Sequence, residues 1–233
     1  MSQSAWPLAL HLVRSLDLHA MTWRHHGLGM LQSEIDENLR VHIWHPDLVR
    51  IPEGPRRIHD HRFDITSYVI VGEVGDVRYR VVIGESAKPT PGWTETQCWE
   101  IKHAKTQVQA RVNVVPIRKG DPVSAAEFAA LLQAGARLGC STATDAELLG
   151  RALFATIASA SMRAGAVYEI PRRVFHTTVV SKLAVTFVQR SNFDDKLARV
   201  LGDAGDGKSA IQKTNHDELH HILKLAARAL KDA

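Results

Sequence analysis

The sequence predicts a mainly β protein, in which about eight short strands form a sandwich or barrel with a helical insertion and terminal helices. Three observations predict this class. Short runs of alternating apolar and polar residues are separated by turn-forming Gly, Pro and Asp residues. Two stretches between residues 120 and 163 combine capping boxes with residues that favour helices. Apolar residues also recur at helical spacing near both ends of the sequence.

The first segment predicts a helix that leads into a β-hairpin. Leu8, Leu12 and Leu16 lie at helical spacing and would form one apolar stripe. The runs GMLQSEI and NLRVHIWH then meet at the turn-like residues 36–38, as two hairpin strands do. We expect residues 1–27 to form a helix and connector outside the barrel.

A series of strands follows the hairpin, and the predicted insertion interrupts it. The insertion, at about residues 120–163, contains SAAEFAALLQAG and TDAELLGRALFATIASASM, each opened by a capping box. The barrel would cover residues 28–192, and a C-terminal helical extension would cover residues 193–233. That extension would hold a short helix in NFDDKLARVLGD and an amphipathic helix in NHDELHHILKLAARALKDA. The further candidate strands are residues 67–71, 77–84, 98–103, 107–115, 166–170, 173–180 and 183–190.

Composition excludes several classes of protein. Of the 233 residues 45% are apolar and 23% are charged, an ordinary globular balance. No apolar run approaches the ~20 residues that span a bilayer, and we expect no membrane partner. The net charge of +4 comes from scattered basic residues without an aromatic ladder, which argues against a nucleic-acid partner. Two cysteines, Cys98 and Cys140, form no disulfide framework and predict a reducing, cytoplasmic location.

The stretch IHDHRFDITSYVIVGE carries the first functional pattern. Side chains two apart on a strand share a face, so His59 and His61 should point together towards the core side. Two adjacent imidazoles in a core suit a divalent transition metal, for which neutral imidazole is the commonest ligand. A third ligand should come from another strand, and His176, inside the apolar run RVFHTTVV, is the best candidate.

These two segments resemble the two conserved motifs of the cupin superfamily. Gly54, His59, His61 and Gly72 match the first motif, and Gly165, Pro171 and His176 match the second. The resemblance covers roughly residues 39–190, excluding the insertion. It implies a cupin-like jelly-roll β-barrel with a metal at its centre, bound by His59, His61 and His176.

The sequence departs from the motifs at three positions. The Glu ligand of the first motif is missing, and strand alternation directs the nearby Asp64 to the opposite face, in a supporting role. In the second motif, Arg173 replaces a later Gly and Val180 replaces a terminal Asn. The expected ligand set is therefore three neutral histidines.

A three-histidine site resembles that of the thiol dioxygenases among cupins. The resemblance implies iron(II), with nickel, zinc or manganese as other metals, and O₂ with a small anionic substrate such as a thiol. It is also compatible with a homodimer, with the N-terminal hairpin and terminal helices as contact surfaces.

Three further residues are candidates for substrate binding. Tyr79 alternates with Arg78 and Arg80, so its side chain should face the pocket or pack in the core. His103, in CWEIKH, would point inward from a neighbouring strand or lie on the surface. Arg173 could hold a substrate carboxylate through its guanidinium. No catalytic acid or base is identified from the sequence.

Three functions remain open at this stage. The first is an iron-dependent oxygenase, the second a non-oxidative metal enzyme such as an isomerase or lyase, and the third a non-catalytic protein that binds a small ligand. A barrel of this kind hosts many chemistries, so the fold alone does not decide among them.

Overall fold

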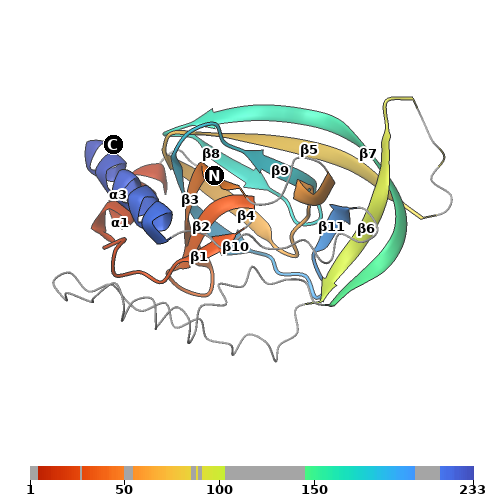
Figure 1. Ribbon diagram of the computed structural model, residues 1–233, viewed down its shortest axis with the longest axis horizontal. Helices are drawn as coiled ribbons and strands as arrows, with labels where there is room; N and C mark the ends of the chain where they lie inside the picture. The colour runs from red at the N-terminus through yellow and green to blue at the C-terminus, as the bar shows by residue number, and fades with distance from the viewer. Residues whose placement is uncertain are drawn as a thin grey trace.

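The described part of the protein contains two antiparallel sheets and two α-helices that cover one of them (Figure 1). The computed structural model describes residues 5–26, 28–49, 55–84, 88, 91–102, 145–202 and 216–233. The mainly β class is confirmed, as are helices near both termini. The elements are α1 (Ala5–Ser15), β1 (Arg24–His26), β2 (Leu28–Glu34), β3 (Leu39–Val49), the 3₁₀ turn η1 (Pro55–Arg57), β4 (Asp64–Val71), β5 (Glu73–Ile83), β6 (Thr94–Lys102), β7 (Asp145–Arg163), β8 (Val167–Ile170), β9 (Phe175–Val179), β10 (Ala184–Ser191), β11 (Arg199–Gly202) and α3 (His216–Asp232).

The larger sheet has the order β1-β2-β3-β10-β4-β8 and is buried on both faces at its centre. Strand alternation gives its two faces different compositions. In β3, Val41 and Ile43 pack in the cluster beneath the helices, whereas His42 and Trp44 line a cavity on the other face. In β10, Thr186 lines the same cavity. This sheet therefore separates an apolar core from the cavity.

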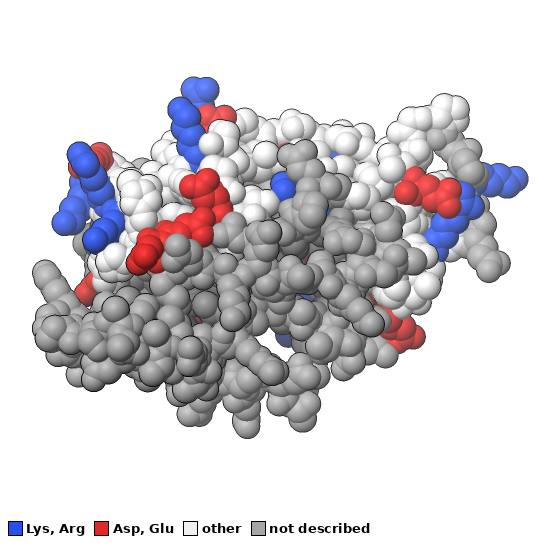
Figure 2. Space-filling view, viewed as in Figure 1, with Lys and Arg blue, Asp and Glu red and all other residues white. Residues whose placement is uncertain are grey.

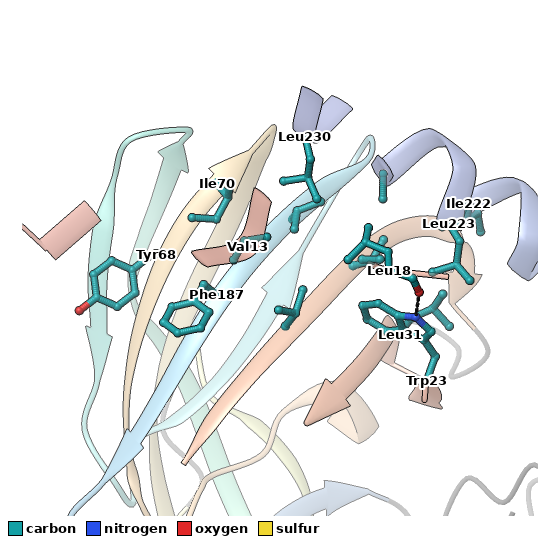
Figure 3. Close-up of a cluster of buried hydrophobic side chains, with 14 of the residues drawn as sticks. Val13, Leu18, Trp23, Leu31, Tyr68, Ile70, Phe187, Ile222, Leu223 and Leu230 are labelled. Atoms are coloured by element: carbon teal, nitrogen blue, oxygen red, sulfur yellow. Dashed lines mark hydrogen bonds between the residues drawn. The ribbon is translucent and has the colours of Figure 1, made fainter. Parts of the chain in front are cut away.

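The helices α1 and α3 pack on the apolar face of this sheet (Figure 3). Val13 of α1 and Ile222 of α3 are almost fully buried, and Trp23 donates from Nε1 to the Leu18 carbonyl at 2.8 Å. The expected stripe is partly wrong, because Leu8 is 69% exposed. The terminal helices belong to the main core and are not appendages.

The second sheet has the order β11-β6-β7-β5-β9. Its two edge strands, β9 and β11, are joined through the segment that carries the paired histidines. His59 forms isolated bridges to His176 in β9 and to Val200 in β11. The segment around His59 thus lies between the two edges, and closure of this kind leaves fewer exposed strand edges.

The second predicted helix of the insertion is wrong, because Asp145–Arg163 form strand β7. This strand pairs with β5 on one side and with β6 on the other, so tertiary pairing outweighs the helix propensity of its Ala and Leu residues. The remainder of the insertion, the candidate strand 107–115, His103 and Gly54 lie outside the described residues.

Two boundaries of the predicted domains also need correction. Within the expected C-terminal helical extension, Arg199–Gly202 form β11, which pairs with β6. The expected N-terminal connector contains β1, which pairs with β2. Both segments are short. Each forms a strand because it pairs with another strand, and local periodicity does not predict such pairing.

On the described surface visible in Figure 2, basic and acidic side chains lie next to each other in several small groups. Along the upper edge of this view, where β5 and β7 lie, charged side chains are sparse. Val82, Ile157 and Val179 are exposed on these strands and on β9. None of the helices in the described part of the chain is long and apolar enough to span a bilayer.

We predict that Gly72→Ala destabilises the protein strongly. Gly72, between β4 and β5, has φ +76°, and an added Cβ would lie 2.3 Å from the Leu183 carbonyl oxygen. Gly84 also has a positive φ, +117°, but an added Cβ there meets nothing within 4 Å. Urea unfolding should show a cost of about 1–2 kcal/mol for Gly84→Ala, from backbone strain alone. Gly72→Ala should cost at least about 2 kcal/mol more, and equal costs would contradict the close packing at this turn.

Candidate metal centre

Three histidine side chains come together between the two sheets. His59 and His176 are joined by two backbone hydrogen bonds, from His59 N to the His176 oxygen at 3.1 Å and from His176 N to the His59 oxygen at 2.9 Å. His61 lies two residues further along an extended segment and projects to the same side as His59. The ring centroids of the three are 4.8, 4.8 and 5.1 Å apart. The predicted convergence of His59, His61 and His176 is thus present.

The spacing of their nitrogen atoms fits a shared ion. The three potential ligand atoms lie within 4.8 Å of one another, and Nε2 of His61 is 3.0 Å from Nε2 of His176. Two nitrogens that each lie about 2.1 Å from one ion are about 3.0 Å apart at a right angle and about 3.4 Å apart at a tetrahedral angle. The observed distance between His61 and His176 matches the right-angled arrangement, which occurs in octahedral sites.

Two of the rings are held in the tautomer that metal binding requires. Nδ1 of His59 lies 2.9 Å from the Arg57 carbonyl oxygen, and Nδ1 of His176 lies 3.0 Å from Oδ1 of Asp76. Carbonyl and carboxylate oxygens only accept hydrogen bonds, so both Nδ1 atoms carry the proton. In a neutral imidazole Nε2 then has a free lone pair. Support of the distal ring nitrogen in this way is typical of metal-binding histidines.

Burial keeps His59 and His61 neutral. Burial, followed by the neighbouring His176, lowers the pKa of His59 to about 3, and burial followed by the other two histidines lowers the pKa of His61 well below its ordinary value. Burial alone would raise the pKa of Asp76, but hydrogen bonds from His176 and Arg78 outweigh it and lower that pKa. Two neutral imidazoles near a carboxylate anion favour a bound cation.

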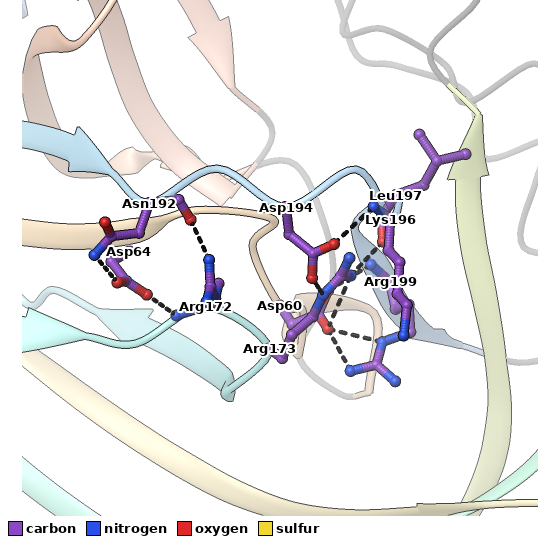
Figure 4. A network of polar contacts seen from close by, with 9 residues as sticks. All are labelled: Asp60, Asp64, Arg172, Arg173, Asn192, Asp194, Lys196, Leu197 and Arg199. Atoms are coloured by element: carbon purple, nitrogen blue, oxygen red, sulfur yellow. Dashed lines mark hydrogen bonds and ion pairs between the residues drawn. The ribbon is translucent and has the colours of Figure 1, made fainter.

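A polar network anchors the segment that carries the histidines (Figure 4). Asp60, between His59 and His61, points to the opposite side and is fully buried. Its carboxylate accepts hydrogen bonds from the Arg199 backbone N at 2.6 Å and from Nε at 2.7 Å, and it pairs with Nη2 at 2.6 Å. Both carboxylate oxygens of Asp60 are thus held by Arg199, Oδ1 by the backbone N–H and Oδ2 by the guanidinium. Such charge-assisted contacts fix the backbone between His59 and His61.

The three histidines lie at one wall of a cavity of about 50 Å³. A water molecule needs about 10–15 Å³ by this measure, so the cavity holds about four waters or a very small molecule. The residues that line it are apolar, hydroxyl-bearing or histidine, and none of those described is Lys, Arg, Asp or Glu. Besides the three histidines they are Leu28, Met30, His42, Trp44, Ile65, Ser67, Tyr168, Ile170, Thr177, Thr178, Thr186 and Val188.

Two of the three residues predicted to bind substrate, Tyr79 and Arg173, lie away from the cavity. Tyr79 packs with a separate apolar cluster and contacts the ring of Phe154. Of the two positions predicted for its side chain, it therefore takes the one in the core. The Arg173 guanidinium donates to Asp194 at 2.9 Å and to the Leu197 carbonyl at 2.5 Å. Neither residue lines the cavity. His103 lies outside the described residues.

The predicted supporting role of Asp64 belongs to another carboxylate. Asp64 accepts hydrogen bonds from the Arg172 backbone N and from the Asn192 amide, each at 2.7 Å, at the exposed start of β4. Within the described residues, no hydrogen bond or ion pair joins Asp64 to the three histidines. Asp76 occupies the position next to His176 instead.

Sequence analysis missed both Asp76 and His42. Strand alternation places Asp76 opposite to Tyr79, on the face of β5 that also carries Arg78 and Arg80, and these arginines suggested an exposed face. In the structure Asp76 is buried on this face, because His176 of the neighbouring strand β9 lies beside it. Such pairing between distant strands is not visible in the sequence. The alternation of the hairpin, with Val41 and Ile43 on one face, could have placed His42 on the cavity side.

Comparison with protein families and curated sequences does not identify the family of this chain. No protein-family model matches the chain, and no curated protein matches its sequence. The site must therefore be interpreted from its own geometry.

We predict that the metal-free protein loses stability steadily as the pH falls. His42 is 8% exposed, and its pKa is lowered to about 3, chiefly by burial and then by Arg40. Between pH 6.5 and about 3 the unfolded chain binds a proton at this position and the folded protein does not, so acid favours unfolding.

Urea titrations at several pH values in EDTA, on wild type and His42→Leu, measure this effect. His42 should contribute a slope of up to about 1.4 kcal/mol per pH unit to the free energy of unfolding, and the variant should lack that part. Above pH 7 the two curves should run parallel. Equal slopes between pH 4 and 6 would show that His42 is protonated in the folded protein.

Proposed function

We propose that His59, His61 and His176 bind one divalent transition-metal ion, and that the protein is a cupin-type enzyme acting on a small anionic molecule. Iron(II) is the preferred metal and O₂ the co-substrate. One observation carries the proposal: three imidazoles, one buried and two half-buried, converge, and two of them have Nδ1 engaged as a donor. That arrangement leaves Nε2 lone pairs facing a common point, where a cation is the natural partner.

Features of the backbone support the cupin resemblance. Two of the motif glycines, Gly72 and Gly165, have φ values of +76° and +93°. Arg173, which replaces a motif glycine, has φ +66°, the left-handed conformation that glycine adopts most easily. From β7 to β11 the strands also alternate between the sheets, with β8 and β10 in the larger sheet and β7, β9 and β11 in the other. Such alternation is typical of a double-sheet jelly roll.

The donor set favours an anionic substrate. Three neutral imidazoles leave the charge of a divalent ion uncompensated, so a thiolate, carboxylate or enolate would bind well beside it. Bound iron(II) would supply Lewis acidity and redox chemistry towards O₂, whereas zinc would supply Lewis acidity alone. The apolar walls of the cavity exclude water from the reacting groups.

The remaining residues of the cavity favour the oxygenase over an isomerase or lyase. Non-oxidative chemistry of that kind needs a base or acid whose pKa lies near the working pH. Burial raises the pKa of Tyr168 to about 12, and the pKa of His42 is about 3. The described lining includes no carboxylate. A reaction in which the metal and O₂ carry the chemistry depends less on a side-chain acid or base, so these side chains favour the oxygenase.

We predict that the purified protein contains about one metal ion per chain and that His176→Ala abolishes this binding. Elemental analysis of protein purified without added metal, and after reconstitution with iron(II), measures it. His11→Ala, which removes an exposed histidine on α1, is the matched control and should retain the metal.

If iron binds, O₂ uptake with small thiols and carboxylates tests the oxygenase. Stoichiometric zinc or nickel without O₂ uptake would favour the isomerase or lyase, and no metal after reconstitution would leave a ligand-binding protein.

We predict that Asp76→Asn weakens metal binding by about 10–100-fold, because it removes the anion that orients His176. Competition with a chromophoric chelator measures the affinity, and thermal unfolding checks that the variant folds. Glu95→Gln is the control, since Glu95 is exposed and pairs with Arg151 where β6 and β7 meet. A variant that folds and binds metal as tightly as wild type would refute the role of Asp76.

A further inference from the structure

The larger sheet forms one wall of the cavity, and two polar atoms of this wall lack hydrogen-bond partners. His42 in β3 is 8% exposed and Ser67 in β4 is 1% exposed, and both residues line the cavity. Nε2 of His42 and Oγ of Ser67 are buried and unpartnered among the described residues. Buried polar groups of native proteins are normally hydrogen-bonded, so two exceptions in one cavity call for a partner in a bound molecule.

The two residues lie on the same face of the sheet, on either side of strand β10. His42 pairs with Thr186 of β10, and Ser67 pairs with Val188, two residues further along that strand. Side chains two apart on a strand share a face, and directly paired residues of an antiparallel sheet share it too. A molecule in the cavity therefore meets His42 on one side of β10 and Ser67 on the other.

The neighbouring polar groups leave this hydrogen-bonding capacity open. Thr186 Oγ1 accepts a hydrogen bond from Nε1 of Trp44 at 3.1 Å, and the Trp44 ring meets the His42 ring edge-on. Ser67 pairs with Tyr168 of β8, where burial raises the pKa of the tyrosine and the Ser67 hydroxyl opposes this rise. A hydroxyl has one hydrogen and two lone pairs, so Ser67 can contact Tyr168 and still bind a ligand.

The chemistry of this wall favours an uncharged ligand group. None of the described residues that line the cavity is Lys, Arg, Asp or Glu. Burial, followed by Arg40, lowers the pKa of His42 to about 3, so its imidazole is neutral near pH 7. A charged group that enters such a place without a charged partner loses its hydration, which costs far more than the desolvation of a neutral amide or hydroxyl.

We propose that His42 and Ser67 form a subsite for a neutral hydrogen-bonding group of the substrate, such as a hydroxyl or an amide. This inference rests on the proposed function, because it names the substrate class of the same site: the anionic donor binds the metal, and the opposite end is uncharged. A hydroxyl or amide both donates and accepts hydrogen bonds, so it suits Ser67 and either tautomer of His42. The cavity volume of about 50 Å³ limits the substrate to a short chain between the two groups.

Binding calorimetry on zinc-loaded protein tests this proposal with a matched pair of ligands. The pair is 2-mercaptoethanol and 1-propanethiol, which differ by a hydroxyl in place of a methyl group at the end remote from sulfur. The measured quantity is the ratio of their two affinities in the wild type, in Ser67→Ala, in His42→Phe and in the double variant. The double variant gives the ratio that arises from the thiol and the zinc ion alone.

The ratio in favour of the alcohol should be about three- to ten-fold larger in the wild type than in the double variant, since a neutral hydrogen bond contributes modestly. Each single variant should give an intermediate ratio, and these variants decide if the double variant does not fold. Ser33→Ala is the matched control, because Ser33 is a buried serine of the same sheet that pairs with Val41, on the face beneath the helices. It should keep the wild-type ratio. The same ratio in the wild type and in both single variants would overturn the subsite.

A second measurement, on the metal-free protein, separates the subsite from the metal proposal. Acetamide and acetate have the same shape, but only acetate is charged. Acetamide should shift the side-chain NMR signals of His42, and Ser67→Ala should weaken its binding. Tighter binding of acetate, or acetamide that leaves the His42 signals unchanged, would overturn the neutral subsite. Zinc affinity is measured before any ligand is added, so a failure of the metal proposal is recognised on its own.

Discussion

The pair of backbone hydrogen bonds between His59 and His176 connects the fold and the site. The same residues that bridge the edges of the second sheet also project their rings to one point between the sheets. Because the bridge consists of backbone groups, it fixes two imidazoles relative to each other without using their side chains. The ring nitrogens are left for Arg57 and Asp76 on one side and for a cation on the other. The same backbone contact therefore joins the edges of the sheet and brings the imidazoles of His59 and His176 together.

The larger sheet stabilises the fold through one face and lines the cavity with the other. Its outer face packs against α1 and α3 through fully buried residues such as Val13, Leu31 and Ile222. Each such side chain contributes about 1.5–3 kcal/mol by leaving water. The inner face carries buried polar groups such as His42 and Thr186, which stabilise less or cost stability. One face thus holds the fold together while the other is free to carry chemistry.

Local periodicity predicted the strands and the histidine cluster because both depend on short-range geometry. His59 and His61 needed only the two-residue repeat of an extended chain, and the strand character of the segment around His176 placed the third ring. The prediction failed where partners distant in sequence decide the structure. The Ala-rich segment of β7 has helical propensity, but pairing on both sides makes it a strand. In β5, Arg78 and Arg80 suggested a solvent-exposed face, but Asp76 on that face is buried beside His176 of β9, a strand distant in sequence.

Charge balance links the site to what it can bind. His59 and His61 are neutral, and the Asp76 carboxylate that supports His176 is shared with Arg78. The described lining of the cavity holds no carboxylate. A divalent ion bound in the cluster would keep most of its positive charge, inside largely apolar walls that screen it poorly. A bound anion would supply the missing negative charge, whereas a neutral molecule of the same size would not.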